Sequence, residues 1–355
     1  MRRILLWCAQ NRWLSTHVPR WGFARRAVKR FLPGEAFDSA LREAVEFRQE
    51  GIGTLFTRLG ENLTNLEDAT DVVVHYENVL IACTAIGAEI SVKPTQLGLD
   101  IDPAAAFSNL SRLAGSAAEA RSFLWIDMEG SPYTEATLDL YTRVHAEHAN
   151  TGLCLQAYLR RTAADVTRLL PVKPAIRLVK GAYAESAEIS FRKKADVDAN
   201  YLALCVLMLP EVKRGALRLT LGTHDVELVA RVWRFGEALG LERSQLEINM
   251  LYGIRSRELR RLAREGFTVK DLVAYGDAWY AWYLRRLAER PANMLFVVLL
   301  KARELHRHGR RAVVVCDLGA IVVMASCLLG PISNTKSFPY LFLLLEKISP
   351  WPIAW

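Results

Sequence analysis

The segment LCLQAYLRRTAADVTRLLPVKPAIRLVKG (153–181) contains two short apolar runs separated by a more polar stretch. The runs, LCLQAY (153–158) and AIRLVKG (175–181), have the length and composition of buried strands, and the polar stretch between them suits a covering helix. Strands that alternate with helices pair in parallel. The segment therefore predicts one repeating unit of a parallel α/β sheet.

The same unit recurs along the chain, and eight candidate strands result. They are GTLFTRL (53–59), AEISVKP (88–94), SFLWIDME (122–129), LCLQAY (153–158), AIRLVKG (175–181), LRLTLGTHD (217–225), LEINMLY (246–252) and DLVAYG (271–276). Eight such units favour a closed (βα)8 barrel of the TIM type over an open sheet. No G-x-G-x-x-G follows the first run, which counts against a dinucleotide-binding domain.

The length of 355 residues suits one barrel of about 250 residues with extensions at both ends. We expect a basic N-terminal helical segment (1–50), the barrel (51–300) and a C-terminal extension (301–355). The first 34 residues carry no acidic side chain, and FDSALREAVEF (37–47) has helical spacing with Gly51 as a stop.

The tail has an unusual composition, because residues 312–332 contain a single charge, Asp317. That run is long enough to span a bilayer, although a central Asp weakens this interpretation. A buried or poorly ordered extension and a non-native segment are the alternatives. The apolar stretch 4–9 is too short for a secretory signal, whereas the Arg-rich start also fits a mitochondrial transit peptide. We expect a cytoplasmic protein, with peripheral membrane association as the alternative.

The net charge of +8 and pI of about 9.2 favour anionic partners. The chain lacks the interleaving of aromatic and basic residues typical of nucleic-acid surfaces, so nucleic acid is not expected as a partner. None of the six cysteines forms a C-x-x-C pair. They are expected to be reduced and buried, and no metal site is predicted.

Polar residues lie within or just after most of the apolar runs. They are Lys93, Asp127, Gln156, Lys180, Thr223, His224, Asp225 and Glu247. The carboxyl ends of barrel strands form the mouth where active sites occur, so we expect these residues to converge there. After the last run, Arg285 and Glu289 share a helix face, and Arg285 with Arg286 could grip an anionic group.

Seven segments resemble those of monofunctional proline dehydrogenases, over about 35–295 and in the family's order. They are KPTQLGL (93–99), IDMEGS (126–131), LQAYL (155–159), RLVKGAY (177–183), THD (223–225), MLYGI (250–254) and YLRRLAERPAN (283–293). The resemblance implies a distorted (βα)8 barrel that binds FAD at its mouth. It implies oxidation of L-proline to Δ1-pyrroline-5-carboxylate, the first step of proline catabolism, with electrons passed to a quinone.

The resemblance also implies roles for individual residues. Asp127 and Arg177 correspond to catalytic residues, with Arg177 near flavin N5. Flavin contacts are implied for Met128, Gln156, Arg177, Lys180, Gly181, Ala182, Thr223 and His224. Substrate contacts are implied for Lys93, Tyr183, Arg285, Arg286 and Glu289. This fits the chemistry, because the proline carboxylate needs several cationic donors, and Asp127 near Lys93 would keep a buried ammonium charged.

Two departures from the family pattern leave alternatives open. Leu272 stands where the family has a tyrosine that lines the substrate pocket, and Asn249 stands where glutamine is common. The first makes hydroxyproline or another cyclic imino acid an alternative substrate. Because Lys93 and Lys180 lie at strand ends, a Schiff-base aldolase without flavin is a second alternative.

Overall fold

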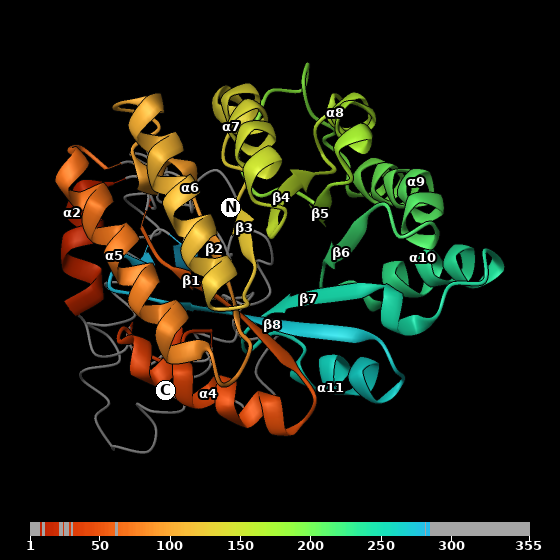
Figure 1. The fold of residues 1–355 in the computed structure, drawn as a ribbon, viewed down its shortest axis with the longest axis horizontal. Coiled ribbons are helices and arrows are strands. Elements are labelled where there is room, and N and C mark those ends of the chain that lie inside the picture. The colour runs from red at the N-terminus through yellow and green to blue at the C-terminus, as the bar shows by residue number, and fades with distance from the viewer. Residues whose placement is uncertain are drawn as a thin grey trace, which may run out of the picture. The chain divides into compact units, whose positions relative to one another are not determined.

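The computed structural model describes residues 8, 11–20, 24, 28–29, 31–60, 63–280 and 282–284. Eight strands form a closed barrel in chain order, and β8 pairs with β1 to complete it (Figure 1). Every neighbouring pair is parallel. The expected (βα)8 fold is therefore confirmed.

Helices alternate with the strands along the barrel wall. The strands are β1 (Gly53–Arg58), β2 (Glu89–Val92), β3 (Leu124–Ile126), β4 (Thr151–Gln156), β5 (Ala175–Val179), β6 (Arg218–Gly222), β7 (Glu247–Leu251) and β8 (Thr268–Tyr275). The helices between them are α5 (Leu66–Cys83), α6 (Pro103–Glu119), α7 (Thr134–Glu147), α8 (Thr162–Leu169), α9 (Lys194–Lys213), α10 (Val226–Ala238) and α11 (Ser256–Arg264).

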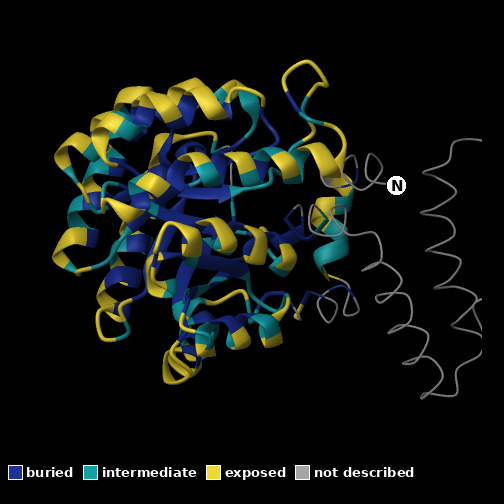
Figure 2. Ribbon diagram, turned by 90° about the vertical axis from the view of Figure 1, so that its right-hand side faces the viewer, coloured by how far each residue is buried: buried dark blue, intermediate teal, exposed yellow. Residues whose placement is uncertain are grey.

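Alternation along each strand separates the two faces of the barrel wall. On β2, Ile90 and Val92 join the large apolar core beneath the helices, whereas Glu89 and Ser91 make polar contacts inside the barrel. The strands are buried and the outer sides of the helices are exposed (Figure 2). The apolar half of each strand thus anchors its helix and leaves the other half free for the barrel interior.

Helix α4 (Phe37–Gln49) precedes the barrel and confirms the helix predicted at 37–47. It buries Ala40, Ala44 and Phe47 against the barrel core. Gly51 has a φ of +73°, a left-handed conformation that favours glycine and ends the helix. Nearer the N-terminus, α2 (Arg12–His17) is capped by the side chain of Asn11, which accepts from the backbone N–H of Leu14.

No helix in the described part of the chain is long and apolar enough to cross a membrane. The run at 312–332, for which a membrane span was considered, lies outside the described residues. The cysteines were predicted to be buried and reduced. In the barrel, Cys83, Cys154 and Cys205 are buried free thiols.

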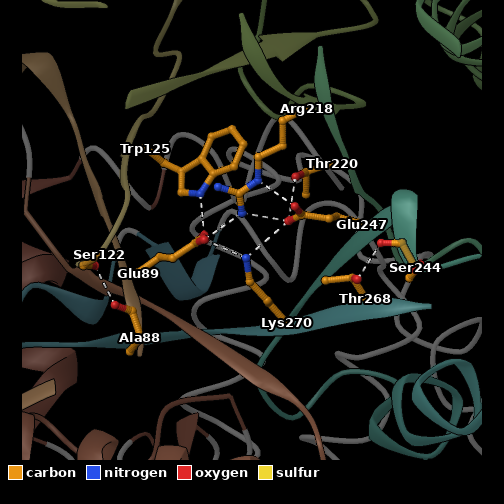
Figure 3. A network of polar contacts seen from close by, with 10 residues as sticks. All are labelled: Ala88, Glu89, Ser122, Trp125, Arg218, Thr220, Ser244, Glu247, Thr268 and Lys270. Carbon is orange, nitrogen blue, oxygen red and sulfur yellow. Dashed lines mark hydrogen bonds and ion pairs between the residues drawn. The ribbon is translucent and has the colours of Figure 1, made fainter. Parts of the chain in front are cut away.

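The amino end of the barrel is closed by an ionic network (Figure 3). Arg218 on β6 bonds Glu89 at 2.6 Å and Glu247 at 2.6 Å, and Lys270 on β8 bonds the same two carboxylates at 2.6 and 3.2 Å. Trp125 on β3 donates from Nε1 to Glu89 at 2.7 Å. Two cations against two carboxylates balance the charge of this partly buried layer.

This network corrects the expectation that Glu247 lies at the mouth. Glu247 is the first residue of β7, so it lies at the amino end of the barrel, opposite the mouth. In the run LEINMLY (246–252) the acid is the second of seven residues, which already indicates the amino end of the strand. Charges at this end of a barrel serve stability rather than catalysis.

Candidate functional site

Five of the predicted residues end or directly follow five consecutive strands. Lys93 follows β2, Asp127 follows β3, Gln156 ends β4, Lys180 follows β5 and Thr223 follows β6. Since all strands are parallel, these positions lie at the same end of the barrel. Their convergence at the mouth is therefore confirmed, while the roles assigned to them remain predictions.

A triangle of hydrogen bonds forms the floor of this mouth. Arg177 pairs with the Oδ1 atom of Asp127 and donates from Nη2 to Ser91 Oγ at 2.8 Å. Ser91 Oγ in turn donates to Asp127 Oδ1 at 2.9 Å. Arg177 is 2% exposed, and its guanidinium lies 5.2 Å from the Trp125 ring. The two predicted catalytic residues are thus held together in one network.

The triangle corrects the expected pairing of Asp127 with Lys93. Among the described residues, Asp127 forms its ion pair with Arg177, and no ion pair of Lys93 is found. Alternation along β2 places Lys93 on the same inner face as Ser91. Lys93 is 8% exposed, so its cation lies in the mouth without a carboxylate within ion-pair distance in this part of the chain.

The β4 and β5 ends approach each other closely. Gln156 donates from Nε2 to the backbone carbonyl of Met128 at 3.2 Å. Gly181 has a φ of +106°, and a Cβ atom there would lie 2.1 Å from the Tyr158 ring. Only glycine fits both this conformation and this space. The predicted cofactor residues Met128, Gln156 and Gly181 therefore occupy positions fixed by local packing.

Two carboxylates tie the mouth loops together. Glu129 accepts from Thr95 N at 3.0 Å and Thr95 Oγ1 at 2.8 Å, joining the loops after β2 and β3. Glu185 accepts from Ser131 N at 2.7 Å and Ser131 Oγ at 2.5 Å, joining the loops after β3 and β5. Tyr183, predicted to cover the substrate, lies in the loop that Glu185 anchors.

A second charged cluster surrounds Lys180. Its Nζ contacts Asp198 at 2.5 Å and Asp225 at 2.9 Å. Burial raises the pKa of Asp225, but the Lys180 ammonium lowers it more, so that the pKa falls to about 2. Asp225 also caps α10 by accepting from Leu228 N. The cluster fixes the start of α10 and with it the THD segment.

His224 in that segment has a defined hydrogen-bonding role. Its Nε2 atom accepts from the backbone N–H of Leu251 at 2.9 Å. A neutral histidine ring that accepts at Nε2 carries its proton on Nδ1. Thr223 is buried beside it and accepts from the backbone N–H of Asp225.

The helix after β8 begins among aromatic side chains. Trp279 donates from Nε1 to Glu35 at 3.1 Å, and its ring lies 6.3 Å from that of Tyr283. Trp279, Trp282 and Tyr283 are all buried, as aromatic crowding in the sequence indicated. Arg285, Arg286 and Glu289, predicted to hold the substrate carboxylate, lie outside the described residues.

Sequence reasoning missed Ser91, Trp125 and Glu129. The signal for the first was present, because the alternation in EISVK places Glu89, Ser91 and Lys93 on one face of the strand. For Trp125, no local pattern distinguishes an indole inside the barrel from one beneath a helix.

The match to a known protein family covers the whole barrel. Residues 40–298 match the family model described as proline dehydrogenase. The chain is 32% identical over 300 residues to proline dehydrogenase 1 of Bacillus subtilis (strain 168), covering 84% of this chain and 98% of that protein. It is 33% identical over 278 residues to the proline dehydrogenase of Deinococcus radiodurans, covering 76% and 88%.

Solved structures share the fold. A proline utilization A (PutA) protein from Bdellovibrio bacteriovorus, inactivated by N-propargylglycine, aligns with a TM-score of 0.68 at 22% identity, covering 80% of this chain. PutA from Bradyrhizobium japonicum aligns with a TM-score of 0.65 at 24% identity, covering 77% of this chain. The alignments span 38% and 32% of those longer chains.

Proposed function

The chain belongs to the proline dehydrogenase family, and we propose that it oxidises L-proline to Δ1-pyrroline-5-carboxylate with FAD as cofactor. The observation that carries this proposal is the buried Asp127–Ser91–Arg177 triangle at the mouth of the barrel, with Lys93 on the same inner face. The mouth thus combines buried cations with a carboxylate, as a site for a small zwitterion requires.

The reaction removes two electrons and two protons from proline and creates a C5=N double bond in its ring. A hydride leaves C5 and a proton leaves the ring nitrogen, so the substrate must be held by groups that do not themselves react. FAD, when bound, supplies the two-electron acceptor, and the protein supplies position and charge.

The polar atoms of the mouth fit a flavin. Arg177 Nη1 and Gln156 Oε1 are buried and find no hydrogen-bond partner among the described residues. Buried polar atoms are usually satisfied, and a ligand that carries both donors and acceptors would satisfy these. Flavin contacts are proposed for Met128, Gln156, Arg177, Lys180, Gly181, Ala182, Thr223 and His224.

The charges of the mouth suit the substrate as well. Lys93 provides a buried cation for the proline carboxylate, and Arg285 and Arg286 are proposed to complete the grip, with Glu289 orienting them. Asp127 holds Arg177 in place, so that a flavin bound at the mouth would have a fixed positive charge nearby. Tyr183 is proposed to cover the substrate and exclude water from it.

The wider setting of the enzyme is also a proposal. We assign residues 1–50 to a basic N-terminal segment, 51–300 to the barrel that binds FAD and proline, and 301–355 to a C-terminal extension. A quinone is the proposed electron acceptor, and a cytoplasmic protein that associates peripherally with the membrane would deliver electrons to it.

The aldolase alternative is weakened by the surroundings of Lys180. Two carboxylates, Asp198 and Asp225, lie within 3 Å of its Nζ atom. A Schiff-base lysine must present its amine to a carbonyl substrate, whereas the Nζ atom of Lys180 is engaged by two carboxylates. The hydroxyproline alternative rests on Leu272, which packs against the barrel's inner apolar cluster of Leu55, Trp125 and Ala175.

Dye-linked oxidation assays distinguish proline oxidation from the aldolase and hydroxyproline alternatives. The purified full-length chain is expected to be yellow, to release FAD on denaturation and to oxidise L-proline with higher kcat/KM than hydroxyproline. A higher kcat/KM for hydroxyproline would show that the proposed substrate is wrong and that the proposed flavin-dependent oxidation is right. The proposal that FAD is the cofactor would be contradicted by a protein that stays colourless after flavin supplementation. It would also be contradicted by release of FMN.

A further inference from the structure

Asn249 on β7 is a buried amide that the reaction described above does not use. Its side chain is 4% exposed, and neither Nδ2 nor Oδ1 finds a hydrogen-bond partner among the described residues. A buried amide without partners destabilises a fold. Its presence therefore calls for a ligand that satisfies it.

The position of Asn249 places this amide inside the barrel. It lies two residues after Glu247, whose carboxylate contacts Arg218 and Lys270 in the ionic network at the amino end of the barrel. Alternate residues of a strand share a face, so Asn249 points inward and one step nearer the mouth. Its register neighbours are Gly222 on β6, which has no side chain, and Lys270 on β8, whose ammonium bonds the carboxylates of the ionic network.

Asn249 is one of several such groups on the inner wall. Arg177 Nη1 on β5 and Gln156 Oε1 on β4 are likewise without partners in the described part of the chain, and both residues are at least nine-tenths buried. Strand register connects these residues. Arg177 lies beside Cys154, which is two residues before Gln156 on β4. Gly222 lies beside Val179 on one side and Asn249 on the other. Strands β4, β5 and β7 thus present donors and acceptors to the barrel interior, with Gly222 of β6 between Val179 and Asn249.

We propose that Asn249 binds the flavin ring system, pairing its amide with a ring edge that carries a carbonyl beside an N–H. This inference rests on the flavin function proposed above. An amide offers a donor and an acceptor side by side, which complements such an edge. A carboxylate substrate would satisfy only Nδ2 and would place negative charge beside Oδ1, so the amide selects the cofactor rather than proline.

The test uses Asn249→Leu, which has a similar shape and no polar atoms, in the full-length chain. With the flavin removed, this variant is expected to melt at the same or a higher temperature than the wild type, because an unpartnered polar group has been replaced by an apolar one. Its affinity for added FAD is expected to fall about tenfold or more. The two readouts move in opposite directions.

Thr54→Val is the matched control. Thr54 is also 4% exposed with an unpartnered Oγ1, but it alternates with Leu55 and therefore faces the helices rather than the barrel interior. This substitution removes the same kind of orphan atom, and FAD affinity is expected to stay unchanged.

Unchanged FAD affinity in Asn249→Leu would overturn the proposal, as would a lower melting temperature without flavin, which would show that the amide serves the fold. If the leucine variant does not fold, Asn249→Ala takes its place, and the loss of FAD affinity decides. A wild-type chain that binds no FAD contradicts the proposed function itself, which distinguishes that failure from this one.

Discussion

Ser91 joins the two residues predicted to carry the chemistry. Its hydroxyl accepts from Arg177 and donates to Asp127, so both of its hydrogen-bonding roles are used within the triangle. The side chain is fully buried and lies too deep between its two partners to make a contact with bulk solvent. We interpret Ser91 as a positioning residue for the Arg177 guanidinium.

Ser91→Ala is expected to lower kcat for proline about tenfold, because a hydrogen bond to a charged group contributes about 1.5–3 kcal/mol. The flavin reduction potential is expected to become more negative, since the guanidinium is held less firmly near the electron acceptor. Potentiometric titration and steady-state kinetics measure the two effects. A variant that loses stability but keeps both the potential and kcat would assign Ser91 to the fold alone.

The predicted carboxylate clamp is tested at Arg285 and Arg286. Replacing either arginine by methionine removes charged hydrogen bonds, so KM for proline should rise about 10–150-fold. Arg286→Lys keeps the charge but loses the planar fork and should also be impaired. Flavin content is the control, because the proposed flavin contacts lie in the barrel. Loss of flavin with an unchanged KM would make this helix a cofactor support.

Among the structural elements, the amino-end ionic network is the most consequential for stability. Lys270 neutralises Glu89 and Glu247 in a partly buried layer, where its side chain is 14% exposed. Lys270→Met leaves one guanidinium against two carboxylates and should lower the free energy of unfolding by about 3 kcal/mol. Denaturant unfolding measures this loss, and KM for proline should not change because the network lies opposite the mouth.

Arg168→Met is the matched control for this network. Arg168 pairs with Glu135 and Asp139 on the surface, where all three side chains are largely exposed. Exposed ion pairs contribute at most about 1 kcal/mol. Equal effects of the two substitutions would show that the buried network has no special stabilising role.

Strand β8 carries a buried acid on its outer face. Asp271 is 1% exposed, and burial raises its pKa from 3.8 to about 8. The folded state therefore holds a proton that the unfolded chain loses near pH 4. This contribution to stability is complete below about pH 4 and declines as pH rises through about 8.

Asp271→Asn cannot ionise, so its stability should lack this pH dependence. The difference in melting temperature, variant minus wild type, is expected to grow in favour of the variant between pH 5 and pH 8.5. Thermal unfolding at a series of pH values gives this difference directly. Two parallel curves over that range would show that Asp271 does not titrate there.

For the whole molecule, periodicity was enough to predict the barrel but not the ends of its strands. The eight apolar runs all became strands, yet β4 begins at Thr151 and β8 at Thr268, earlier than the runs at 153 and 271. Lys270 explains the second difference, because a strand interior that faces an ionic network carries charge and interrupts the apolar pattern.

The sequence predicted which end of the barrel carries the candidate site, but it did not predict which side chains form ion pairs there. Parallel strands place Lys93, Asp127 and Arg177 at one mouth, and the sequence contains that information. The choice of Arg177 over Lys93 as the partner of Asp127 depends on strand register and barrel closure, which join residues 50 positions apart. The expectation for Glu247 was wrong for a different reason, because the first residue of a strand lies at the amino end of the barrel.

The most direct test of flavin-dependent proline oxidation is an anaerobic titration of the purified protein with L-proline, followed by absorbance. We expect a visible flavin band that bleaches on addition of proline, with formation of Δ1-pyrroline-5-carboxylate equal to the flavin reduced. A flavin band that persists at saturating proline, while dithionite still bleaches it, would contradict the assignment of proline as the substrate.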